Sequence, residues 1–196
     1  MLNSGGIFNM STSLTEYLDT IPQGRLGIIA MRGCEELAEK VSEQILECRA
    51  QFENQTDNNI HLKGYHRESY ILKANFPRFA TGEGKAVITE SIRGYDLFII
   101  ADCFNYNVTY KMYNLKDKEG NPLQIPMSPD DHFADLKRVI SACAGKAKRI
   151  TVVMPMLYEG RQHKRSSRES LDCAVMLQEL CLDMGVDNII TFDAHD

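Results

Sequence analysis

The chain has 196 residues, the length of one domain, and its 22 Lys and Arg against 27 Asp and Glu give a net charge of -5. This acidic balance argues against a general nucleic-acid binder, because such proteins are usually basic. No apolar run reaches the ~18 residues of a membrane span, and the N-terminus lacks the basic and apolar segments of an export signal. We therefore predict a cytoplasmic protein with neither a nucleic-acid nor a membrane partner.

The six cysteines form no Cys-x-x-Cys pair, and most lie among apolar residues in helix-like patterns. This arrangement favours reduced core thiols over disulfides. The cysteines concerned are Cys34, Cys48, Cys103, Cys143, Cys173 and Cys181.

The first half of the chain begins with a polar extension, residues 1–24, and the predicted domain covers residues 25–196. The apolar run Leu26–Met31 predicts a strand that is buried on both faces, as in a parallel sheet. Leu37, Val41 and Ile45 then repeat at helical spacing, which predicts an amphipathic helix.

The middle of the chain carries short strand-like segments and one long connection. The expected strands are Ile60–Leu62, Tyr70–Phe76, Lys85–Thr89 and Leu97–Ala101. Residues 105–129 are polar and rich in turn residues, which makes them longer than an ordinary loop of a compact domain. We interpret them as an insertion or an interaction arm.

The last third reads as helix, strand, helix and strand. Asp130 opens a helix, Arg149–Met154 forms a strand, a helix runs from Leu171 to a stop at Gly185, and Asn188–Phe192 forms a strand. Alternating strands and helices predict an α/β fold with a mostly parallel sheet. Ligands of such folds bind at the carboxyl ends of the strands.

A basic loop follows the predicted strand Arg149–Met154. It places the four cations Arg161, Lys164, Arg165 and Arg168 within eight residues at the ligand edge of the sheet. Guanidinium groups match phosphate oxygens in a bidentate manner, so the loop suits a polyphosphate. A solvated charged turn is an equally simple interpretation of this loop.

Two further segments carry side chains that can bind a ligand. Asp193 and His195 alternate at a strand end, so both can face one divalent ion, although a turn or a helix start is the simpler interpretation. Phe79 and Glu83 flank a Gly-bracketed turn that contains Thr81; a purine could stack on Phe79 and donate to Glu83. On spacing alone, a plain hairpin turn is the better interpretation. The histidines His61, His66 and His132 lack ligand-like spacing and are expected in loops or on the surface.

Taken together, these segments resemble ribose-phosphate pyrophosphokinases, also called phosphoribosyl pyrophosphate synthetases. The resemblance runs from about Gly27 to Asp196. The segments that carry it are Leu37–Lys40, Arg78–Phe79 with Gly82–Glu83, Glu90–Gly94, Arg161–Arg165, Ser167–Ser170 and Ile190–His195.

The resemblance implies a three-layer α/β/α fold of the phosphoribosyltransferase-like (type I) class and a homo-oligomer. It also implies transfer of the diphosphoryl group of ATP to ribose 5-phosphate with Mg²⁺, giving phosphoribosyl diphosphate and AMP. By the family pattern, ATP would contact the basic loop, a metal ion would lie at the C-terminal pair, and the adenine of a neighbouring subunit would lie at the Gly-bracketed turn. The residues concerned are Arg161, Gln162, Lys164 and Arg165 for ATP, Asp193 and His195 for Mg²⁺, and Phe79, Thr81 and Glu83 for adenine.

The chain also departs from the family pattern. Thr81 stands where the family has Asp or Asn, His163 replaces the Asp of the basic loop, and residues 105–129 exceed the usual connection. The C-terminal half that carries the catalytic loop and most of the ribose 5-phosphate site is expected to be absent, so no catalytic residue is assigned in this chain. The alternative is a non-catalytic regulatory subunit of the same fold that binds a full-length synthetase.

Overall fold

The computed structural model describes residues 23–55 and 67–195. Four parallel strands form the central sheet in the order β1-β4-β7-β8. These strands are β1 (Arg25–Ala30), β4 (Tyr95–Ile100), β7 (Arg149–Val153) and β8 (Asn188–Ile190). The expected parallel sheet is confirmed. The expected N-terminal extension lies almost entirely outside the described residues, as does the expected strand Ile60–Leu62.

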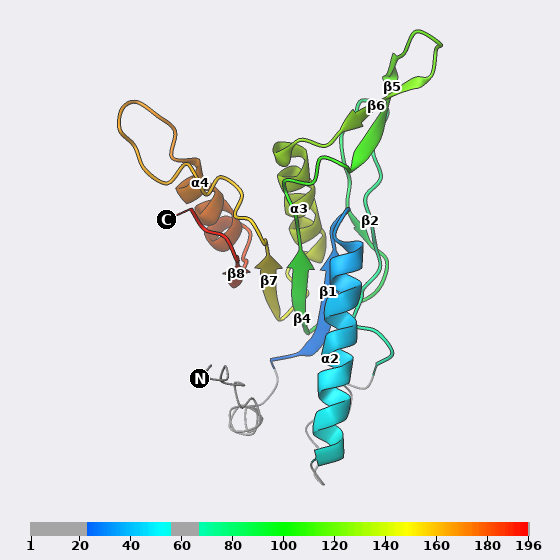
Figure 1. The fold of residues 1–196 in the computed structure, drawn as a ribbon, viewed down its shortest axis with the longest axis vertical. Coiled ribbons are helices and arrows are strands. Elements are labelled where there is room, and N and C mark those ends of the chain that lie inside the picture. Colours follow the sequence, from blue (N-terminus) through cyan, green and yellow to red (C-terminus); the bar gives the residue numbers. More distant parts are fainter. Residues whose placement is uncertain (1–22, 56–66, 196) are drawn as a thin grey trace, which may run out of the picture.

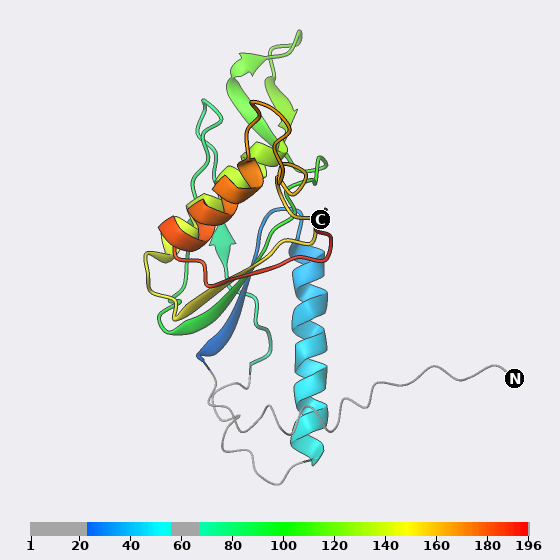
Figure 2. The same ribbon diagram turned by 90° about the vertical axis from the view of Figure 1, so that its left-hand side faces the viewer.

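Helices cover both faces of the sheet, so the fold has three layers (Figures 1 and 2). The helix α2 (Glu35–Gln55) covers one face, where Ala38 packs with Ile28 and Ile100. On the other face lie α3 (Pro129–Cys143) and α4 (Asp172–Gln178), whose Leu136 and Met176 belong to the larger core cluster. Alternate side chains of buried strands point to opposite faces, which explains the unbroken apolar runs in the sequence.

Helix boundaries follow local signals. Ser128 caps α3 by accepting from the Asp131 amide, and the Asp131 side chain accepts from the Ser128 amide. At its other end, Ala144 is left-handed. A π-helical turn, Glu179–Asp183, continues α4. The helical segment ends before Gly185, whose φ of 74° suits glycine.

The region between α2 and β4 is less regular than the sequence indicates. The expected strand Tyr70–Phe76 is reduced to a bridge from Ile71 to Ile28 and the short strand β2 (Ala74–Asn75), which pairs with β3 (Val87–Ile88). The Arg78–Gly84 turn joins β2 to β3 and is closed by a bridge between its two end residues.

Residues 105–129 contain two strands, although their sequence predicts a long loop. They fold into an antiparallel hairpin of β5 (Thr109–Lys116) and β6 (Pro122–Pro126), which projects from the body beyond the carboxyl edge of the sheet (Figure 1). Hydrogen bonds pair the two strands of the hairpin, and several of its side chains are exposed, including Tyr113 and Leu115. The sequence of the hairpin lacks the apolar runs of the buried strands, which explains why its strands were not predicted.

Two expectations about individual residues are wrong. His132 is buried in α3, and its Nε2 lies 2.9 Å from the Asn105 carbonyl oxygen, so it is not a surface residue. Cys48 is exposed on α2 instead of lying in the core. All six thiols are free, as expected. Within the described residues, no helix is long and apolar enough to cross a membrane.

Candidate functional site

The segments that follow β7 and β8 lie side by side at the carboxyl edge of the sheet. Met156 forms a parallel bridge with Asp193, and the Asp193 amide donates to the Pro155 carbonyl over 3.0 Å. The Leu157 amide donates back to the Asp193 carbonyl over 3.3 Å. This backbone pairing extends the β7–β8 ladder past the strand ends and fixes the start of the basic loop against the C-terminal segment.

Turn geometry then directs the basic loop. The Gly160 amide donates to the Leu157 carbonyl, and a side chain at Gly160 would crowd that same oxygen. Glu159 has a φ of 57°, and its carbonyl accepts from the Gln162 amide over 2.9 Å. The chain therefore reverses just before Arg161, so that Arg161 lies at the strand ends.

Three of the residues predicted to bind ATP or metal meet in one small hollow. Arg161, Asp193 and His195 line it together with Met156, Leu157 and Gly160. Its volume of about 60 Å³ corresponds to about two water molecules. It therefore suits an ion or one phosphate group at a time, and a nucleotide would have to extend from it into solvent.

His163, which departs from the family pattern, lies next to His195 at the edge of the hollow. Its ring lies 5.1 Å from the ring of His195, centroid to centroid, at an interplanar angle of 46°. Its Nδ1 lies 3.1 Å from the Gly160 carbonyl oxygen. The sequence does not predict the contact between His163 and His195. The two residues lie in different loops, which meet only because β7 and β8 are paired in the sheet.

The remaining residues of the basic loop lie outside the hollow. Gln162 Oε1 lies 3.0 Å from the Ser170 hydroxyl oxygen, and that hydroxyl donates to the Asp172 carboxylate over 2.6 Å. Lys164 and Arg165 are exposed further along the loop and do not line the hollow. Ser166 closes this part of the loop: its amide and hydroxyl donate to Glu169 and lower the pKa of that carboxyl.

A buried layer supports the loop from below. Tyr158 stacks on Phe133 with ring centroids 4.5 Å apart and donates from its hydroxyl to Asp130 over 2.6 Å. Burial and the neighbouring Asp130 carboxylate raise the pKa of the Tyr158 hydroxyl. Tyr158 therefore stays a neutral donor that ties the basic loop to the first turn of α3.

A divalent cation would find two protein ligands in the hollow, one carboxylate and one imidazole. Among the described residues no group of three or more His, Cys, Asp and Glu is placed to hold a metal ion. Mg²⁺ is usually held by one or two carboxylates and completes its shell with water and substrate phosphates. Asp193 supplies one such carboxylate, so the hollow fits Mg²⁺ that arrives with a nucleotide better than it fits a closed structural metal site.

The structure does not bring the predicted adenine residues to this hollow. Phe79, Thr81 and Glu83 lie on the Arg78–Gly84 turn, and no contact among the described residues joins that turn to Arg161 or His195. The Phe79 ring is 56% exposed, and the Thr81 hydroxyl donates to Glu83 over 2.7 Å. The turn is closed by the Phe79 amide, which donates to the Glu83 carbonyl over 2.8 Å. One subunit therefore presents these two sets of residues as separate surfaces.

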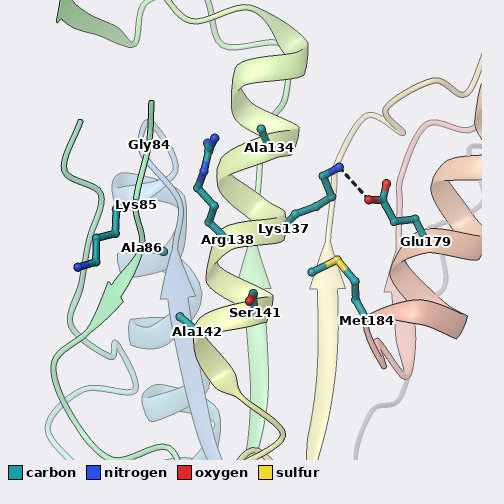
Figure 3. Close-up of a pocket in the computed structure, with 10 residues that line it drawn as sticks. All are labelled: Gly84, Lys85, Ala86, Ala134, Lys137, Arg138, Ser141, Ala142, Glu179 and Met184. Atoms are coloured by element: carbon teal, nitrogen blue, oxygen red, sulfur yellow. Dashed lines mark hydrogen bonds and ion pairs between the residues drawn. The ribbon is translucent and has the colours of Figure 1, made fainter. Parts of the chain in front are cut away.

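A larger groove of about 610 Å³ runs along the outer face of α3, between the Gly84–Ala86 segment and α4 (Figure 3). Its cations are largely engaged: Lys137 pairs with Glu179 at 2.8 Å, and Arg138 pairs with Asp135 at 2.7 Å. Figure 3 shows Lys85 pointing away from Arg138. None of the residues predicted to bind ATP or metal lines this groove.

Comparison with known proteins agrees with this architecture. A sequence model of the family described as "N-terminal domain of ribose phosphate pyrophosphokinase" matches residues 26–183. The crystal structure of phosphoribosylpyrophosphate synthetase from Mycobacterium smegmatis has a similar fold, with a TM-score of 0.59 and 21% sequence identity. The match covers 88% of this chain and 43% of that one. The α/β fold is thus the phosphoribosyltransferase-like fold.

Curated relatives carry the same family name. Ribose-phosphate pyrophosphokinase 1 of Schizosaccharomyces pombe is 34% identical over 60% of this chain, and the match spans 24% of that protein. Ribose-phosphate pyrophosphokinase A of Dictyostelium discoideum is 30% identical over 63% of this chain, spanning 32% of that protein. The matched region is therefore between about a quarter and a third of the length of these relatives. With a family match over most of its length, the chain belongs to the ribose-phosphate pyrophosphokinase family and contains its N-terminal domain.

Proposed function

We propose that the chain supplies the ATP-binding and Mg²⁺-binding side of a ribose-phosphate diphosphokinase. That enzyme would transfer the diphosphoryl group of ATP to ribose 5-phosphate and release AMP. The observation that carries the proposal is the hollow in which Arg161 meets Asp193 and His195 at the carboxyl edge of a parallel sheet. This edge is where α/β folds bind ligands.

Each residue of the hollow has a distinct task in this proposal. Arg161 has no partner among the described residues, so its guanidinium can grip phosphate oxygens in a bidentate manner. Asp193 and His195 would hold Mg²⁺, which when bound neutralises phosphate charge and orients the transferred group. Gln162 would donate from its amide NH₂ to a phosphate oxygen. Held in this way, the phosphate chain would be aligned for attack by the acceptor hydroxyl.

The other partners follow from the same proposal. The adenine would lie on Phe79, Thr81 and Glu83 of a neighbouring subunit, which agrees with the separation of the two surfaces and makes a homo-oligomer necessary. Most of the ribose 5-phosphate site would lie outside the matched N-terminal domain. We therefore expect the 196-residue chain alone to make no AMP from ATP and ribose 5-phosphate at the rate of a full synthetase.

Thermal stabilisation by Mg-ATP tests the site. We expect Mg-ATP to raise the melting temperature of the chain, and expect Arg161→Ala and His195→Ala each to remove most of that rise. Arg93→Ala is the matched control, because Arg93 is an exposed arginine just before β4, at the opposite edge of the sheet. A full Mg-ATP effect in both site variants would contradict the assignment.

A further inference from the structure

The β5–β6 hairpin packs directly on the Arg78–Gly84 turn. In Figure 1 the connection between β2 and β3 rises beside the base of the hairpin. The Arg78 guanidinium lies over the Tyr110 ring, with 4.7 Å from its central carbon to the ring centroid. The Asn114 amide lies 3.4 Å from the Ala80 carbonyl oxygen. One face of β5 thus covers a turn that is distant in sequence.

Arg78 links the hairpin, the turn and the core. Its Nη1 donates to the Gly82 carbonyl over 3.1 Å, and its Nη2 donates to the buried Asp135 carboxylate over 2.7 Å. The Arg78 side chain is only 7% exposed. Tyr110 supplies the aromatic lid that shields this guanidinium from water, and a shielded cation–π contact is stronger than an exposed one.

The Arg78–Gly84 turn packs tightly against the hairpin. Gly82 has a φ of 92°, and a side chain at this position would overlap Met112 Sδ and crowd the Tyr110 ring. The strand β5 alternates, so Tyr110 and Met112 face the turn while Lys111 is exposed. These two side chains therefore form the contact between β5 and the turn.

We propose that the hairpin holds the Arg78–Gly84 turn in its purine-binding shape, with Tyr110 and Met112 as positioning residues. Neither residue needs to touch the nucleotide. Phe79 and Glu83 carry the contact surface, and the hairpin fixes the backbone that presents them. This inference rests on the proposed function, in which the turn receives adenine.

Hydrogen exchange and binding by the Tyr110→Leu chain test the inference. We expect the amides of Phe79 and Gly82, which close the turn, to exchange about tenfold faster once the cation–π lid is lost. We expect the dissociation constant of Mg-ATP to rise severalfold while that of Mg-tripolyphosphate, which lacks the purine, stays unchanged. Tyr113→Leu is the matched control, because Tyr113 is an exposed tyrosine of the same strand.

Other variants keep the test decisive. Tyr110→Phe retains the ring and should behave as the unaltered chain does, and Met112→Ala replaces Tyr110→Leu if the latter fails to fold. Unchanged exchange at Phe79 and Gly82 would overturn the inference, as would equal weakening of ATP and tripolyphosphate. If the unaltered chain bound ATP no more tightly than tripolyphosphate, the proposed binding of a purine by the turn would be wrong. Faster amide exchange in the Tyr110→Leu chain would still show that the hairpin stabilises the turn.

Discussion

Among single residues, Asp135 is a buried carboxylate that pairs with several arginines. Its side chain is 3% exposed and faces three arginines: Arg78 and Arg138 at 2.7 Å each, and Arg32 at 3.8 Å. Arg78 belongs to the turn, Arg138 to α3, and Arg32 to the segment just after β1. One buried carboxylate therefore ties three separate segments together.

Removing this carboxylate should be costly. We expect Asp135→Ala to lower the free energy of unfolding by about 3–5 kcal/mol, because it leaves the buried Arg78 guanidinium without its counter-charge. Urea denaturation measures the change. Glu36→Ala breaks an exposed pair with Lys40 on α2 and should leave the unfolding midpoint where it is. Equal effects of the two substitutions would show that burial does not strengthen the Asp135 contacts.

The buried thiols give a second prediction at this scale. Burial raises the pKa of Cys34 and Cys143 from 9.0 to about 11, and that of Cys103 to about 12. A thiol whose pKa is raised by folding stabilises the fold below its unfolded pKa, and this stability is lost as the pH rises toward the folded value. We therefore expect unfolding to become easier between about pH 9 and 11, the window set by Cys34 and Cys143.

Thiol labelling at pH 8 checks the same residues. The exposed Cys48 should react first, and Cys34, Cys103 and Cys143 should react only after denaturant is added. Mass spectrometry of peptides identifies the labelled sites. Labelling of Cys103 in the native protein at the rate of Cys48 would be inconsistent with its burial.

At the scale of elements, local signals predicted the helices well and the hairpin poorly. The sequence predicted that α3 starts at Asp130, one residue from its observed start, and that the helix before β8 stops at Gly185, because helix ends depend on neighbours in the chain. The strands β5 and β6 gave no such signal. Their residues Tyr110 and Met112 pack against a turn about thirty positions earlier, and only the folded chain reveals that partner.

The cap of α3 can be tested by one substitution. Ser128→Ala removes the acceptor of the Asp131 amide and should reduce the free energy of unfolding by about 1 kcal/mol. Ser141→Ala, on the exposed side of the same helix, is the control and should change stability little. Chemical denaturation of both variants gives the comparison. A Ser128→Ala chain as stable as the Ser141→Ala chain would show that the cap adds nothing.

For the molecule as a whole, part of the candidate site could be predicted from the sequence. The order of strands and helices placed Arg161 and His195 at the same edge of the sheet, and the structure brings them together with Asp193. The sequence could not show that Lys164 and Arg165 lie outside the hollow or that His163 lies against His195. Those placements depend on how the loop turns at Glu159 and Gly160.

The whole molecule also leaves large apolar side chains uncovered. Phe192, beyond the end of β8, is 77% exposed, and Ile190 in β8 is 40% exposed. Contiguous exposed apolar patches usually mark interaction surfaces, and we expect these two side chains to form part of one. We expect the sedimentation coefficient of the chain to rise with concentration, and Phe192→Ser to weaken this association. Tyr113→Ser is the control, and a monomer at every concentration would refute the prediction.

The closed end of the β5–β6 hairpin has a practical consequence. Asp117 organises it by accepting, through its side chain, from the amides of Glu119 and Asn121, while Gly120 adopts a φ of 86°. The tip projects away from the sheet, and a side chain at Gly120 would meet no atom within 4 Å. An epitope or a spectroscopic probe grafted between Lys118 and Gly120 would therefore be exposed to solvent. It would contact neither the core nor the hollow.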